Sequence, residues 1–266
     1  MRLMTFEFAL WLVVLTGVAS AQTKPAFFVG SATGGTSVLG TNPVREVVKP
    51  FEFGVLAQGG VGLTQNRGNY KFLLAGVHAG KVLTPTVGNG MLRGNFEYAV
   101  EIFPFWQSYT PTSLRQNCLA VAAGSSTYLC SAYYNIGGTF SGITITPDIL
   151  RWNFAGAGRF APWVQGAGGL LWTNHKYPAF GGPPSYAPGS VVNNPGNTIT
   201  NNAANADTSV WNFTPQFGIG AHYFVRPNRS IDFGANAIHI SSSSLGDRNP
   251  GVNASVQFSL GYSWWK

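Results

Sequence analysis

Residues 211–223 read WNFTPQFGIGAHY and show most clearly how this chain folds. Successive side chains of a strand point to opposite faces of a sheet. On this spacing one face carries Trp211, Phe213, Phe217, Ile219, Ala221 and Tyr223. The other face carries Asn212, Thr214, Gln216, Gly218, Gly220 and His222. An apolar face opposite a polar face, repeated with period two, predicts a strand that separates lipid from a polar interior.

The same alternation recurs along the chain. In residues 93–107, Glu97 and Glu101 alternate with apolar residues such as Phe96 and Tyr98. Carboxylates on an enclosed face suit a barrel lumen better than the packed core of a sandwich. The pattern predicts an all-β fold, an eight-stranded antiparallel transmembrane β-barrel of the outer membrane. Its expected strands are 50–64, 69–83, 93–107, 138–153, 159–174, 208–225, 229–242 and 251–265.

The composition agrees with a barrel in lipid. Charged residues make up 9% of the chain, far below the roughly 25% of ordinary soluble domains. Aromatic residues reach 14%, and beyond the first residues no run of about 18 apolar residues is available for a spanning helix. The net charge of +7 suits an anionic partner. The basic residues are scattered, without a nucleic-acid-binding motif, so no nucleic-acid partner is expected.

The chain is predicted to have three parts. Residues 1–21 resemble a signal peptide, with Arg2, the apolar stretch 8–18 and the small residues 19–21. Residues 22–47 are expected to form a periplasmic lead-in, and residues 48–266 the barrel. Long polar loops at 108–137 and 175–207 should face outward, and short turns the periplasm. The aromatic final strand resembles the signal read by outer-membrane assembly, so the expected location is the outer membrane of a Gram-negative cell.

Cys118 and Cys130 lie in one polar segment of a chain that we expect to be exported. A disulfide between them is therefore predicted. The four histidines are scattered and, with two cysteines, show no metal-ligand spacing. Residues 156–161 match a dinucleotide-loop spelling, but Pro162 follows where a helix is required, so they are read as a turn. No metal and no cofactor are predicted.

A candidate site lies in the strand 229–242. Its lipid-facing side carries Ile231, Phe233, Ala235 and Ala237, and then continues into His239 and Ser241. These two polar residues interrupt an apolar run near the outer end of the strand. A serine hydroxyl becomes a nucleophile when a neighbouring imidazole takes its proton. The pair would meet an ester of a lipid in the outer leaflet.

The residues around this pair also carry a family resemblance. His239-Ile240-Ser241-Ser242, followed by the segment NPGVN at 249–253 and an aromatic final strand, resembles the lipid A 3-O-deacylase family, also called PagL-like or acyloxyacyl hydrolase-like. The segments TITP at 144–147 and LRWNF at 150–154 resemble its middle strand. The resemblance covers residues 48–266 in layout, and its specific motif covers 239–253.

The resemblance implies an eight-stranded barrel that removes the 3-linked acyl chain from lipid A of lipopolysaccharide. It implies a metal-free Ser-His-Glu triad in which Ser241 is the nucleophile and His239 the general base. The family's glutamate, twelve residues after the serine, falls on Asn253, and an asparagine that follows the serine is replaced by Ser242. A neutral amide cannot stabilise an imidazolium as a carboxylate does. Asn253 stands at the position of the third triad residue of the family, and Asp247 in the preceding loop is an alternative acid.

Two classes of function therefore stay open. One is an outer-membrane lipid A esterase, and the other is a non-catalytic barrel with a structural, adhesive or lipid-binding role. An acid placed near His239 would favour the enzyme. Glu97, Glu101, Arg151, Asp232 and His222 are interpreted as a hydrogen-bond and ion-pair network of the lumen. A wide pore is disfavoured because side chains fill an eight-stranded barrel, and a homodimer is left open.

Overall fold

The computed structural model describes residues 49–64, 68–156, 158–177, 186–193, 209–242 and 253–266. The expected signal peptide and lead-in lie outside these residues. The barrel strands are β1 (Phe51–Gly62), β2 (Lys71–Val82), β3 (Gly94–Arg115), β6 (Tyr134–Phe154), β7 (Phe160–Tyr177), β9 (Ser209–Phe213), β10 (Gln216–Arg226), β11 (Arg229–His239) and β12 (Ala254–Trp265). In the part of the chain that the structure describes, no helix has the length and apolar character needed to cross a bilayer.

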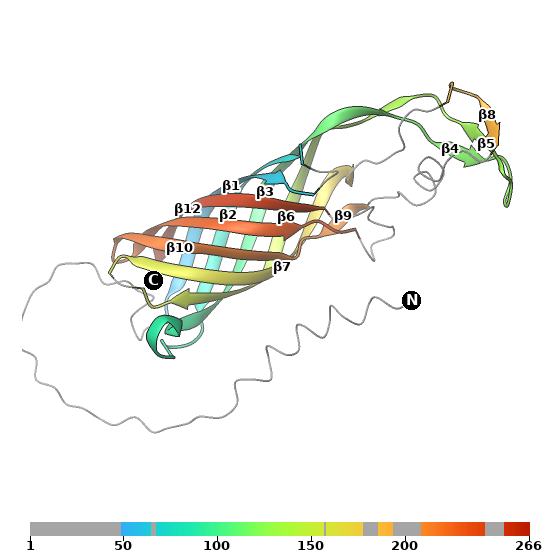
Figure 1. Cartoon of the computed structure of the whole chain (residues 1–266). Coiled ribbons are helices and arrows are strands. Elements are labelled where there is room, and N and C mark those ends of the chain that lie inside the picture. Colours follow the sequence, from blue (N-terminus) through green and yellow to red (C-terminus); the bar gives the residue numbers. More distant parts are fainter. Residues whose placement is uncertain (1–48, 65–67, 157, 178–185, 194–208, 243–252) are drawn as a thin grey trace, which may run out of the picture. The chain divides into compact units, whose positions relative to one another are not determined.

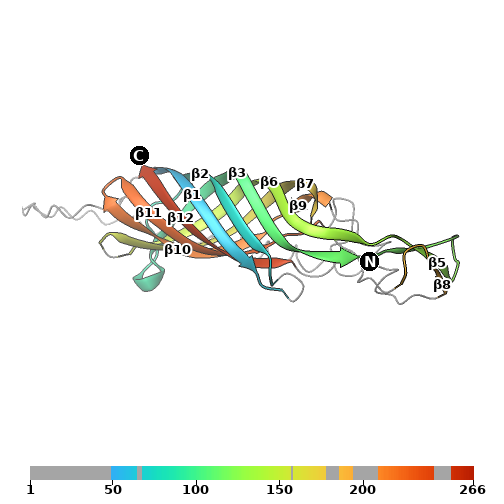
Figure 2. The ribbon, with the colours of Figure 1, turned by 90° about the horizontal axis from the view of Figure 1, so that it is seen from above.

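Antiparallel pairing closes these strands into a barrel (Figure 1). Neighbours in the chain pair with each other, and β12 returns to β1 with Trp265 opposite Glu52. Both β9 and β10 pair with β7, so they are two pieces of one barrel strand. The described residues thus form the predicted eight-stranded antiparallel barrel. Figure 2 shows β1, β2, β3, β6 and β7 side by side, in the order in which they pair.

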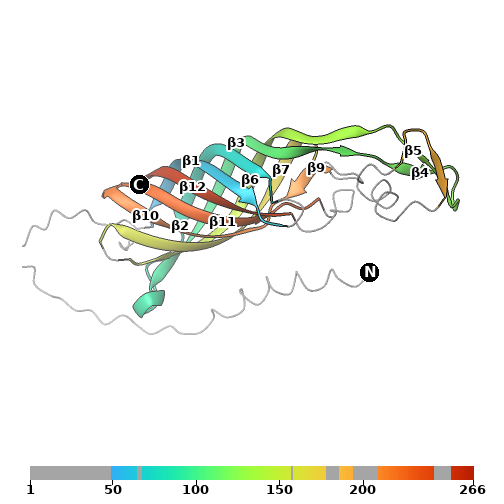
Figure 3. The same ribbon diagram turned by 45° about the horizontal axis from the view of Figure 1, so that its top comes forward.

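The two ends of the barrel differ. The C-terminus lies at the same end as the short turn between β10 and β11 (Figure 3). Short turns mark the periplasmic end of such barrels, so the opposite end is extracellular. There the predicted loop 108–137 is partly wrong, because β3 and β6 stay paired as far as Arg115 opposite Tyr134. Register shifts along this pair allow the long ribbon to bend, as β-bulges do.

The extracellular segments also contain a small second sheet. It consists of β4 (Cys118–Ala120), β5 (Thr127–Cys130) and β8 (Val191–Asn193). Cys118 is directly opposite Cys130, and the two form the predicted disulfide. A crosslink over 12 residues stabilises a fold by about 3 kcal/mol in the chain-entropy model. β8 lies inside the predicted loop 175–207, which is therefore not all loop.

The faces of the strands follow the predicted alternation. Phe217 and Ile219 are exposed on the outer face of β10, at 57% and 56%. Glu97 and Glu101 are buried inside, and the predicted interior network is confirmed by ion pairs of Arg151 with Glu97 and of His222 with Asp232. This polar network lies in the periplasmic half of the interior.

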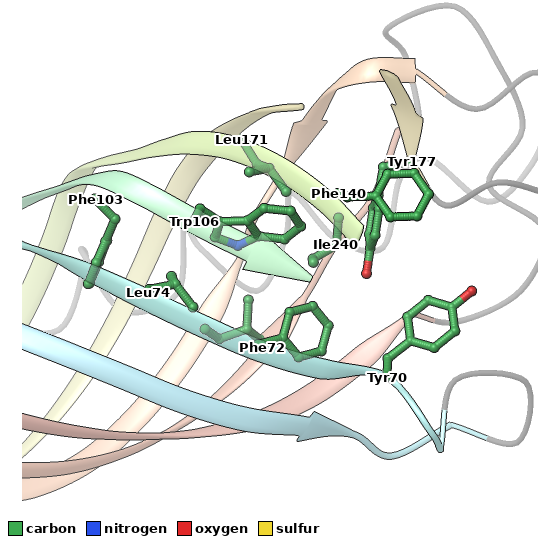
Figure 4. Close-up of a cluster of buried hydrophobic side chains, with 10 residues drawn as sticks. Tyr70, Phe72, Leu74, Phe103, Trp106, Phe140, Leu171, Tyr177 and Ile240 are labelled. Carbon is green, nitrogen blue, oxygen red and sulfur yellow. The ribbon is translucent and has the colours of Figure 1, made fainter. Parts of the chain in front are cut away.

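The extracellular half of the interior also holds a large apolar cluster, which the prediction of a polar lumen did not include. Figure 4 shows aromatic and aliphatic side chains pointing toward one another from several strands. We call this cluster the apolar plug; it consists of Tyr70, Phe72, Leu74, Phe103, Trp106, Phe140, Leu171, Tyr177, Ile238 and Ile240. Ile238 and Ile240 face inward on and just beyond β11, which explains why they interrupt its polar pattern.

A substitution of Trp106 tests how much the apolar plug contributes to stability. The side chain of Trp106 is 2% exposed, and its ring lies 5.5 Å from that of Tyr177 and 6.1 Å from that of Phe72. Trp106→Ala should lower the free energy of unfolding by about 3–5 kcal/mol, because it leaves a cavity among packed rings. Urea unfolding of protein refolded into phospholipid vesicles measures this. The matched variant Trp211→Ala removes a half-exposed ring from the outer face, and an equal loss there would contradict the account.

Candidate active site

His239 and Ser241 lie on the outer face of the barrel at the extracellular end of β11. His239 ends the strand and is directly opposite Ala254 of β12. Ser241 forms an isolated bridge with Phe213 at the end of β9. Both side chains are half-buried, and they share their face with Phe233 and Ala237. The segment therefore presents an imidazole and a hydroxyl, two residues apart, on a lipid-facing surface.

Both neighbouring strands hold this segment by backbone hydrogen bonds. The N–H of Ser241 donates to the carbonyl of Phe213 over 2.9 Å, and the N–H of Phe213 donates to the carbonyl of Ser241 over 2.7 Å. On the other side, the N–H of Ile240 donates to the carbonyl of Asn253 over 2.9 Å. Backbone pairing on two sides fixes the positions from which the two side chains project.

The neighbouring barrel strand is interrupted beside the pair. Residues 208–225 are predicted as one strand, whereas the structure has β9 and β10 separated by Thr214 and Pro215. A proline lacks the N–H that a central strand requires, which was the available signal for the break. The carbonyl of Pro215 still accepts a hydrogen bond from the N–H of His239 over 3.0 Å.

The ring of His239 has a defined contact with β12. Its Nδ1 lies 3.1 Å from the backbone carbonyl oxygen of Asn253. Because a carbonyl oxygen only accepts, this contact assigns the proton to Nδ1 and leaves Nε2 as a proton acceptor. A backbone carbonyl is thus the group that orients the imidazole.

The side chain of Asn253 points the other way. It is 1% exposed and faces the barrel interior, on the same side of β12 as Ser255 and Gln257. Among the described residues, neither Oδ1 nor Nδ2 of Asn253 has a hydrogen-bond partner. The structure therefore brings His239 to the main chain of Asn253 and not to its amide.

The other predicted groups near the site are placed as follows. Ser242 is buried and faces inward, and within the described part of the chain its Oγ has no hydrogen-bond partner. Asp247 lies outside the described residues, as do Ser243 and Ser244. Two neighbours that the sequence pattern did not identify are Ala254, opposite His239, and the carbonyl of Asn253.

The surface around the pair is apolar. Phe213 and Phe217 are exposed on the outer face, and Phe217 is directly opposite Ala237. Ala237 is in turn opposite Val256 of β12. A hydroxyl and an imidazole are the groups that nucleophilic acyl transfer uses, and here both border a surface on which a hydrocarbon chain can lie.

These features define a class of protein, a small outer-membrane barrel with a histidine and a serine on its lipid-facing surface. The family model described as "Lipid A 3-O-deacylase (PagL)" matches residues 105–263, more than half of the chain. The chain therefore belongs to the lipid A 3-O-deacylase (PagL) family of outer-membrane hydrolases, and its location is the outer membrane.

Solved structures with a similar fold are also known. Neisserial surface protein A is 14% identical, with a TM-score of 0.40 over 80% of this chain and 96% of that chain. The outer-membrane enzyme PagL is 14% identical, with a TM-score of 0.38 over 79% and 98%. Ail of Yersinia pestis is 11% identical, with a TM-score of 0.36 over 82% and 99%. No curated protein sequence matches the chain.

Proposed function

We propose that this protein hydrolyses the 3-O-linked acyl ester of lipid A, with Ser241 as the nucleophile and His239 as the general base. The observation that supports this most is the contact between His239 Nδ1 and the carbonyl of Asn253. It leaves Nε2 to accept a proton on the face that also carries Ser241. In this proposal the main-chain carbonyl of Asn253 takes over the orienting role of the family's glutamate.

The reaction has two steps. Ser241 Oγ attacks the ester carbonyl carbon while His239 Nε2 takes the hydroxyl proton. The bond to the sugar oxygen then breaks, and the imidazolium returns the proton to that oxygen. Water, activated by the same imidazole, next attacks the acyl-serine and releases the fatty acid. The carbonyl of Asn253 fixes the ring tautomer throughout but contributes less charge stabilisation than a carboxylate would.

The position of the pair suits a lipid A substrate. His239 and Ser241 lie near the extracellular end of the barrel, at the level of the outer leaflet where lipid A resides. The exposed Phe213 and Phe217 and the small Ala237 give the acyl chain an apolar surface below the reactive groups. The ester can therefore reach Ser241 while its acyl chain stays in hydrocarbon.

A second candidate is a non-catalytic, lipid-binding barrel. The specific observation in its favour is the replacement of the family's glutamate by Asn253, whose amide faces the interior. In this case His239 and Ser241 would only contact lipid headgroups, and lipid A would stay intact.

The experiment that separates the two uses tag-free protein refolded in detergent and incubated with lipopolysaccharide. Mass spectrometry of the lipid A should show the loss of one acyl chain from a 3-position, together with equimolar free fatty acid. Lipid A of unchanged mass after prolonged incubation with correctly folded barrel would overturn the proposal. Loss of an acyl chain from another position would keep the esterase and change its specificity.

A further inference from the structure

A second cluster of side chains that can bind a metal ion or a proton lies inside the periplasmic half of the barrel, away from His239. It contains Glu52 of β1, His78 of β2 and Glu97 of β3, all buried. One nitrogen or oxygen atom from each lies within 4.8 Å of the others. The three come from adjacent strands, so no local spacing in the sequence marks them as a set.

The ring of His78 is held between carboxylates on both sides. Its Nδ1 lies 3.3 Å from Glu101 Oε1. Its Nε2 lies 3.0 Å from Glu52 Oε2 and 3.8 Å from Glu97 Oε1. In metal sites a histidine commonly donates its far N–H to a carboxylate, which turns the other nitrogen toward the ion. Separations of 3.0–3.8 Å between Nε2 and the two carboxylates suit ligand atoms that each lie about 2.0–2.2 Å from one Zn²⁺ ion.

The environment of Glu97 points to an ion at this place. Glu97 is 0% exposed, and among the described residues its Oε1 has no hydrogen-bond partner. The same oxygen occupies the place of the side chain that Gly80 lacks, because a Cβ at position 80 would clash with Glu97 Oε1 and lie 3.2 Å from His78 Nε2. Among the described residues, a buried carboxylate oxygen without a hydrogen bond therefore lies 3.8 Å from His78 Nε2.

The charge balance is compatible with a divalent cation. Glu52, Glu97 and Glu101 bring three negative charges, and Arg151 brings one positive charge through contacts with Glu52 and Glu97. When an ion takes the place of the proton on His78 Nε2, the imidazole is neutral and the four charged side chains carry a net charge of −2, which is expensive in a buried interior without a counter-charge. Nearby Asp232 is already paired with His222 over 2.7 Å. One divalent ion neutralises the remainder.

We propose that Glu52, His78 and Glu97 bind a divalent transition-metal ion of the Zn²⁺ type, with Glu101 as the residue that positions His78. One nitrogen and two carboxylate ligands match the preferences of such ions. A cavity of about 40 Å³ adjoins Glu52 and His78 and has room for a completing water. The ion ties β1, β2 and β3 together near the periplasmic end and is structural. This inference is independent of the proposed esterase.

A competing set, Glu52, His222 and Asp232, fits less well. His222 Nδ1 and Asp232 Oδ1 already form a 2.7 Å hydrogen bond. Asp232 also accepts hydrogen bonds from Ser230 and Ser263. These contacts satisfy the carboxylate without an ion, whereas Glu97 Oε1 accepts no hydrogen bond from any described residue. His222 is therefore the matched control for His78.

The test uses tag-free protein refolded in detergent, with and without Zn²⁺, followed by metal analysis after gel filtration. Wild type should retain one Zn²⁺ per chain, and X-ray absorption should report one nitrogen ligand with oxygen ligands. His78→Gln should lose the bound ion, while His222→Gln should keep it. Glu101→Gln should weaken zinc affinity by about 10–100-fold, as expected for a residue that orients a ligand.

Several outcomes would overturn the proposal. One is wild type that binds no more Zn²⁺ than His78→Gln, which would make the cluster an ion-pair network only. Another is loss of the ion in His222→Gln with full retention in His78→Gln. If His78→Gln does not fold, the X-ray absorption spectrum of wild type decides alone, because an all-oxygen or multi-histidine environment would exclude this ligand set.

Discussion

Ser241→Ala and His239→Ala should each lower the release of fatty acid from lipopolysaccharide by at least about 10³-fold, because a nucleophile and its base act as one unit. Both side chains are half-buried on the outer face, and neither belongs to the apolar plug. The variants should therefore refold as wild type does. The rate of fatty-acid release at equal folded concentration measures the effect, with folding checked by circular dichroism.

Ser242→Ala is the matched control for this loss. Ser242 is the next residue along the chain, but its side chain is buried and faces the interior. Its removal should leave the rate within a few-fold of wild type. If Ser242→Ala abolishes release and Ser241→Ala does not, the nucleophile has been assigned to the wrong face of the strand.

Ala254→Glu should raise the rate of release by about 10-fold or more. Ala254 is directly opposite His239 on the outer face, and Cβ atoms of such a pair lie about 4.5–5.5 Å apart. A glutamate there reaches the imidazole and stabilises the imidazolium, which a backbone carbonyl does only weakly. The equivalent loss of a carboxylate in serine proteases lowers the rate by about 10⁴-fold, which sets the upper limit of the gain.

Two variants separate charge from position in this experiment. Ala254→Gln has nearly the same shape without the charge and should give no comparable gain. Asn253→Glu restores the family's residue at its aligned position, but the side chain faces the interior. It should destabilise the barrel by burying a carboxylate without a partner, and it should not accelerate release. A large gain from Asn253→Glu with none from Ala254→Glu would contradict the observed orientation of β12.

The barrel was predictable from sequence because its physical cause is periodic. Each strand alternates between lipid and interior, so a residue such as Phe217 or Glu97 reveals its face from its neighbours alone. The outward position of His239 and Ser241 followed from the same alternation along β11. The disulfide followed from the two cysteines of a chain read as exported.

Other features depend on contacts between strands, which alternation does not encode. The apolar plug combines residues from five strands and adjoining segments, and the cluster around His78 combines three strands. The contact of His239 with the carbonyl of Asn253 involves main-chain atoms, which side-chain identity does not report. The break between β9 and β10 could have been predicted from the sequence, because Pro215 lacks the N–H that a continuous central strand requires.

The most direct test of the central claim is covalent labelling of Ser241. Refolded protein is treated with a long-chain alkyl phosphonate ester that mimics the tetrahedral intermediate, and the modified peptide is identified by mass spectrometry. We expect one adduct per chain on Ser241, formed at least about 10³-fold more slowly in His239→Ala because the base is missing. An adduct on another serine, or hydrolysis of lipopolysaccharide that continues undiminished after Ser241 is fully labelled, would contradict the account.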